Sequence, residues 1–66
     1  MYTYLAVKDG SGMFLSKSEQ MDKALNNGFS IYQVDENDQK TLIATPQDGF
    51  LIERPVIENI STFNIN

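Results

Sequence analysis

Residues 2–15 predict a β-hairpin. Residues 2–7 suit a pleated strand, in which Tyr4 and its alternate neighbours lie on one face and Leu5 and its alternate neighbours lie on the other. Residues 8–12 contain two glycines and an aspartate, a composition typical of a turn. The short apolar stretch 13–15 is therefore expected to pair back on the first strand.

A helix is predicted to begin at Ser16. Ser16 and Glu19 have the spacing of a capping box, in which each side chain accepts a hydrogen bond from the backbone amide of the other residue. Met21, Ala24 and Leu25 then recur at the spacing of one helical face. The pattern indicates a helix of about ten residues, which is marginal alone in water, so its apolar stripe is expected to lie on a sheet.

The helix is predicted to end at Gly28. Glycine adopts the left-handed conformation that closes a last helical turn without a Cβ clash. Phe29 follows it directly and is expected to fold back towards Ala24.

Three further strands follow in the sequence. Residues 29–34 and 41–45 are rich in β-branched and aromatic side chains, and the polar stretch 35–40 between them indicates a hairpin loop. Residues 46–49 carry a proline and a glycine where a tight turn uses them. They lead into a predicted strand at residues 50–53.

We expect a single α+β domain at residues 1–55, followed by an apolar C-terminal arm at residues 56–66. Pro55 ends the last strand because proline supplies no donor to the sheet. The arm carries one charge, Glu58, and is too apolar for a solvated tail. It is expected to pack on its own domain or on another chain.

The predicted architecture is a small antiparallel sheet of four or five strands, in the order β-β-α-β-β-β, with one helix on one face. A single short helix covers only part of a sheet, so we expect a protein partner to cover the rest. The candidate interface residues combine aromatic side chains of the sheet with apolar side chains of the arm: Tyr2, Tyr4, Tyr32, Phe50, Ile57, Ile60, Phe63 and Ile65.

Composition lowers the expectation of catalysis. The chain of 66 residues has no histidine and no cysteine, the side chains that most often act as bases, nucleophiles or transition-metal ligands. We therefore predict that the protein is not an enzyme and that it has no catalytic residue, cofactor or metal. The net charge of -4 repels phosphate backbones and anionic lipids, which argues against direct nucleic-acid or membrane binding.

Two local patterns suggest other chemistry. Asp35, Asn37 and Gln39 alternate like the start of a calcium loop, but Lys40 replaces the glycine that such a loop requires. A solvated acidic turn is the simpler interpretation. Tyrosines on neighbouring strands could stack bases, although such platforms normally sit in a positive groove.

Two functional hypotheses remain ahead of a small-molecule sensor and an enzyme. The first is a small non-catalytic protein-interaction module, either a homo-oligomer or a small subunit of an assembly. The alternative is an acidic inhibitor, as mobile elements encode, that occupies the basic channel of a nucleic-acid enzyme. Its carboxylates would come from Asp35, Glu36, Asp38, Asp48 and Glu53. The sequence starts without a positively charged leader, so we expect a cytosolic protein. Its small size and the lack of a catalytic signature are typical of bacterial or phage proteins.

Overall fold

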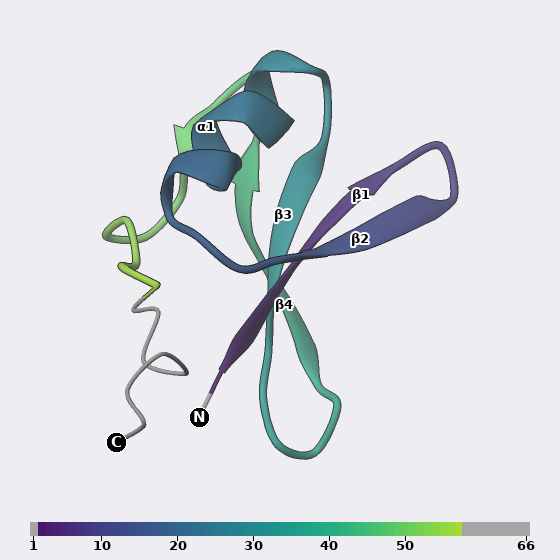
Figure 1. The fold of residues 1–66 in the computed structure, drawn as a ribbon, viewed down its shortest axis with the longest axis vertical. Coiled ribbons are helices and arrows are strands. Elements are labelled where there is room, and N and C mark those ends of the chain that lie inside the picture. The colour runs from purple at the N-terminus through teal and green to yellow at the C-terminus, as the bar shows by residue number, and fades with distance from the viewer. Residues whose placement is uncertain (1, 58–66) are drawn as a thin grey trace, which may run out of the picture.

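The computed structural model describes residues 2–57, which form a five-stranded antiparallel sheet and one helix (Figure 1). The strands lie in the order β2-β1-β3-β4-β5, and each is antiparallel to its neighbours. This confirms the predicted α+β class and element order. The elements are β1 (Thr3–Lys8), β2 (Ser11–Leu15), α1 (Glu19–Asn26), β3 (Ser30–Val34), β4 (Lys40–Thr45) and β5 (Gly49–Phe50).

The first hairpin has a two-residue turn. Asp9 and Gly10 both have positive φ, at 52° and 82°, and Lys8 pairs with Ser11. Positive φ at both turn residues matches the twist of an antiparallel hairpin. The predicted pairing of residues 13–15 with the first strand is therefore confirmed.

The predicted capping box at the helix start is wrong. The helix begins at Glu19, and Ser18 occupies the cap position with helical φ and ψ and no side-chain capping bond. Gln20, rather than Glu19, reaches back, and its Oε1 accepts from the backbone amides of Ser16 at 2.7 Å and Lys17 at 3.0 Å. Because the helix starts later than predicted, it has eight residues instead of about ten.

The helix end agrees with the sequence. Gly28 has φ of +87°, and its amide donates to the carbonyl of Leu25 at 3.1 Å. The amide of Phe29 donates to the carbonyl of Ala24 at 2.9 Å. These two hydrogen bonds satisfy carbonyls of the last helical turn that have no donor within the helix, which agrees with the predicted helix end at Gly28.

The second hairpin joins β3 to β4 and contains a β-bulge. Tyr32 pairs with Leu42 but Ile31 pairs with Ala44, so Ile43 is an additional residue on β4. A bulge of this kind interrupts strict alternation. It explains why Ile43 and Ala44, adjacent in sequence, are both fully buried.

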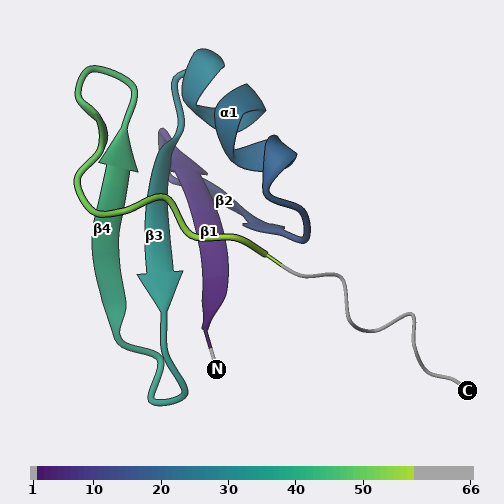
Figure 2. The ribbon, with the colours of Figure 1, turned by 90° about the vertical axis from the view of Figure 1, so that its left-hand side faces the viewer.

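The predicted strand at residues 50–53 is too long. Only Gly49 and Phe50 form β5, although the amide of Leu51 still donates to the carbonyl of Ile43 at 2.8 Å. The chain then bends away from the edge of β4 and crosses the sheet in front of β3 and β1 (Figure 2). We call residues 51–57 the C-terminal strap.

The core lies between the sheet and α1. Met21 and Ala24 of the helix pack in one cluster with sheet residues, and Met21, Ile31 and Ile43 are the largest fully buried side chains. Each burial of this kind contributes roughly 1.5–3 kcal/mol. The helix and the strap lie on the same side of the sheet (Figures 1 and 2), which we call the closed face.

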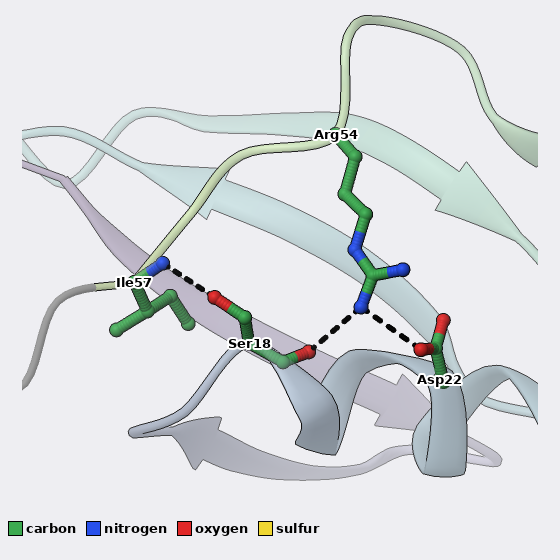
Figure 3. Close-up of polar contacts among 4 residues, drawn as sticks. All are labelled: Ser18, Asp22, Arg54 and Ile57. Carbon is green, nitrogen blue, oxygen red and sulfur yellow. Dashed lines mark hydrogen bonds and ion pairs between the residues drawn. The ribbon is translucent and has the colours of Figure 1, made fainter.

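Polar contacts tie the strap to the start of α1 (Figure 3). The amide of Ile57 donates to Ser18 Oγ at 2.6 Å. Arg54 Nη2 lies 2.9 Å from Asp22 Oδ2 and donates to the Ser18 carbonyl at 3.3 Å. The first residues of the predicted arm therefore pack on their own domain.

Candidate protein-interaction surface

The strand register places four large side chains in one row across the sheet face opposite α1. Leu5 of β1 pairs with both Phe14 of β2 and Tyr32 of β3, and Tyr32 pairs with Leu42 of β4. Paired residues share a face, and successive residues alternate. Because Ala6, next to Leu5, belongs to the core, the row points away from it. We call this side the open face.

Solvent exposure separates the row from the core. Phe14 is 70% exposed and Leu42 is 38% exposed, whereas Leu5 and Tyr32 are intermediate. Single exposed apolar residues are ordinary, but contiguous apolar surface marks sites of association. The open face thus has the chemistry of a docking surface.

The strands that build the open face carry no acidic residue. Neither Asp nor Glu occurs in β1, β2, β3 or β4, whose charged side chains are Lys8 and Lys40. Lys8 Nζ donates to the carbonyl of Asn27 at 2.8 Å. Lys40 pairs with Val34, at one end of the open face. The net negative charge of the chain is therefore excluded from the sheet itself.

The acidic residues named for the inhibitor hypothesis do not form one row. Residues 35–38 lie in the β3–β4 loop, whereas Asp48 lies in the turn at the other end of β4. A strand of that length separates them by about 20 Å. The Asp35 carboxylate also accepts from the backbone amides of Asn37 at 2.8 Å and Gln39 at 3.0 Å, so it organises its own loop.

The sheet divides the predicted interface residues. Tyr4, Phe50 and Ile57 are partly buried against the core cluster on the closed face, whereas Tyr32 lies in the open-face row. Tyr2 precedes β1 and is 54% exposed. The three remaining predicted interface residues lie outside the described part of the chain: Ile60, Phe63 and Ile65.

Tyr4 and Tyr32 cannot form one stacking platform. Their strands are neighbours, as that hypothesis required, but Tyr4 pairs with Gln33 and Tyr32 pairs with Leu5, so the two rings lie on opposite faces. The Tyr4 hydroxyl donates to Gln33 Oε1 at 3.4 Å. Desolvation by burial, with a smaller contribution from repulsion by Tyr2, raises the pKa of Tyr4 above 10.0.

The sequence prediction missed Phe14, Leu5 and Leu42 as members of this surface. A signal for Phe14 was present in the sequence, because a two-residue turn at Asp9–Gly10 fixes the hairpin register and puts Phe14 beside Leu5. Leu42 depends on the bulge in β4, for which the sequence has no comparable local signal.

Residues 2–57 contain neither a candidate metal site nor a candidate membrane span. Among residues 2–57, no group of three or more acidic side chains is placed to hold a metal ion. Within that range, no helix has the length and apolar character needed to cross a lipid bilayer. Comparison with known proteins found no matching family model, and no significant match to a curated protein or a solved structure.

Proposed function

We propose that the protein is a small non-catalytic protein-interaction module that self-associates through the open face. The observation that carries the proposal is the cross-strand row of Phe14, Leu5, Tyr32 and Leu42 on a sheet face without acidic residues. Two such faces can pack about 10 Å apart, as aligned sheets do in sandwiches. A cytosolic location forms part of the proposal and is compatible with a chain without cysteine.

Charge favours a second copy over a basic partner. A partner selected by electrostatics would need carboxylates at the contact, and the open-face strands have none. Two copies of net charge -4 repel each other at long range, and added salt screens that repulsion. Self-association through the open face should therefore persist or strengthen with salt, whereas binding of an acidic inhibitor to a basic enzyme should weaken.

Two adjacent residues of β4 provide a matched test. Leu42 belongs to the open-face row, while Thr41 is also exposed but pairs with Gln33 on the other side of the sheet. Leu42→Asp and Thr41→Asp introduce the same charge at neighbouring positions. Sedimentation velocity over a concentration series should show association for the original chain and for Thr41→Asp, and monomers for Leu42→Asp.

A chain that stays monomeric at every concentration would overturn self-association. Equal effects of the two substitutions would show that charge alone, rather than the open face, controls the assembly. Circular dichroism of both variants checks that each retains the fold.

A further inference from the structure

The outer edge of β2 has backbone groups without a strand partner among residues 2–57, because β2 ends the sheet there. Lys8 and Ser11 flank a two-residue turn, and residues in those positions exchange backbone hydrogen bonds with each other. The direction of these groups alternates along a strand, so those of Gly12 and Phe14 point away from β1. The next residue with this direction, Ser16, already donates its amide to a side chain of α1 at 2.7 Å.

These two residues fix one register for pairing β2 with β2 of a second copy. In that antiparallel register, Gly12 of each copy lies opposite Phe14 of the other, and each such pair exchanges both of its backbone hydrogen bonds. The registers on either side pair Gly12 with itself or Phe14 with itself, and they leave the other residue opposite the turn or opposite Ser16. The matched register puts a two-fold axis at Met13, as a closed pair of identical chains requires.

The side chains of β2 fit the same register. Phe14 is 70% exposed, and in the matched register it lies over Gly12 of the second copy, where no side chain obstructs the ring. Met13 is 48% exposed and lies on the closed face, because it pairs with Ala6 of the core. The two-fold axis therefore sets the Met13 side chains of the two copies directly opposite each other.

A groove on the closed face can receive the Met13 side chain of the second copy. This groove has a volume of about 210 Å³ and lies between β2 and α1, where Gln20, Lys23 and Ala24 line its helix side. Side chains directly opposite each other in an antiparallel pair are about 5 Å apart, so the second Met13 stands at the mouth of the groove. Methionine is unbranched and flexible and fits irregular gaps of this kind.

Charge favours a second copy as the occupant of this edge. β2 carries no charged side chain, so the pairing sets no like charges opposite each other along the strand. The matched register brings the Asp9–Gly10 turn of each copy beside Lys17 of the other. Asp9 and Lys17 are both exposed, and neither is in an ion pair within residues 2–57. The two-fold axis repeats this contact of opposite charges at both ends of the paired strands.

We propose that two copies of this chain pair edge to edge through β2, with Gly12 opposite Phe14 and Met13 on the two-fold axis. The two five-stranded sheets then form one continuous sheet. The contact uses a strand edge rather than the open face, so it goes beyond the proposed function and does not rest on it. Five residues a side are few beside the roughly 20–30 of a stable interface. Edge pairing alone is therefore weak, and Leu42→Asp still sediments as monomers.

A disulfide across the two-fold axis tests the register even when the contact is weak. The chain has no cysteine, so Met13→Cys introduces one thiol per copy. The two Cα atoms of a non-hydrogen-bonded antiparallel pair lie about 4.5 Å apart, within the range of a disulfide. In a glutathione redox buffer, mass spectrometry of the intact protein should find linked pairs of Met13→Cys.

Ser11→Cys is the matched control for this disulfide. Ser11 is exposed and lies on the same strand and the same face as Met13. In the matched register Ser11 lies opposite Leu15, so the two Ser11 positions are about 14 Å apart and beyond the reach of a disulfide. Ser11→Cys should therefore remain as single chains in the same buffer.

Two further measurements separate edge pairing from association through the open face. Linked pairs of Met13→Cys should persist when Leu42→Asp is added, because Leu42 lies on the open face. A failure of open-face association therefore does not decide this result. In the linked pair, the amides of Gly12 and Phe14 should exchange hydrogen about ten-fold more slowly than in the reduced chain. The amide of residue 13, which points to β1, should be unchanged.

Four results would overturn the proposal. The first is that Met13→Cys remains as single chains. The second is that Ser11→Cys links as readily as Met13→Cys. The third is that linking is lost when Leu42→Asp is added, which would show that the open face alone brings the copies together. The fourth is that the amides of Gly12 and Phe14 exchange as fast in the linked pair as in the reduced chain.

Discussion

The two faces of the sheet are built from the same strands but have opposite environments. Ala6 and Ile31 pair on the closed face, and neither is exposed. Their sequence neighbours Leu5 and Tyr32 pair on the open face and remain partly exposed. One short helix therefore covers only one face of the sheet. α1 and the strap lie on the closed face, and residues 2–57 contain no second helix that could cover the open face.

The largest expected difference between the faces lies at two adjacent residues of β4. Ile43 is fully buried in the core cluster, whereas Leu42 is 38% exposed on the open face. Ile43→Ala should lower the free energy of unfolding by about 2–5 kcal/mol, because it leaves a cavity. Leu42→Ala should lower it by about 1 kcal/mol. Urea denaturation at low protein concentration measures both.

Equal losses of unfolding free energy in Leu42→Ala and Ile43→Ala would contradict the difference between the two faces, because Leu42 would then be as well covered in solution as Ile43. Repeating the denaturation at high protein concentration tests whether self-association covers the open face. Self-association through the open face would then raise the cost of Leu42→Ala and leave that of Ile43→Ala unchanged.

A smaller effect is expected where the strap completes the closed face. Ser18→Ala removes the acceptor of the Ile57 amide and should cost about 1 kcal/mol of unfolding free energy. It should also accelerate hydrogen exchange of that amide. Ser16→Ala is the matched control, because the Ser16 hydroxyl makes an exposed contact of 3.3 Å with Gln20 that the Ser16 amide duplicates.

Ser16→Ala is expected to lower the free energy of unfolding by less than about 0.5 kcal/mol. A Ser18→Ala chain with unchanged stability and unchanged exchange at Ile57 would show that the strap does not depend on this hydrogen bond.

The smallest expected effect concerns pH and Tyr4. Burial raises the pKa of Tyr4 in the folded chain above 10.0, so folding favours the neutral hydroxyl. This contribution to stability is complete below the pKa of the unfolded chain, near 10, and is lost as the pH rises through the higher folded pKa. Tyr4→Phe should therefore reduce the loss of stability between about pH 9 and pH 11 in urea titrations.

Tyr2→Phe serves as the control, because it removes only the smaller cause of the Tyr4 shift and should leave most of the pH dependence in place. If Tyr4→Phe loses stability with rising pH as steeply as the original chain, the closed face does not shield this hydroxyl from water.

Local chemistry made part of the fold predictable. The turn at Asp9–Gly10 and the helix end at Gly28 depend on residues within a few positions of each other, and both were predictable from the sequence. The helix start was not predictable in the same way. Ser18 Oγ accepts from Ile57, which lies 39 positions away, and no local pattern indicates that contact.

The candidate surface was predictable only in outline. The excess of aromatic and aliphatic residues indicated that part of the sheet would remain uncovered. Which tyrosine lies on that side depends on the β1–β3 register, which places Tyr4 opposite Gln33 and Tyr32 opposite Leu5. Shifting the register by one residue would exchange the two faces, and that choice is made by the packing of the core rather than by local sequence.

The unequal edges of the sheet set a limit on growth. Within residues 2–57, β2 offers five residues at one edge, whereas β5 offers two at the other before the chain bends towards Pro55. Fibrils formed by lateral addition need two competent borders on each molecule. β2 is the longer free border, because at the other edge β5 and the Leu51–Ile43 hydrogen bond already occupy residues 43–45 of β4, so lateral joining of copies is favoured at β2 and hindered at β5.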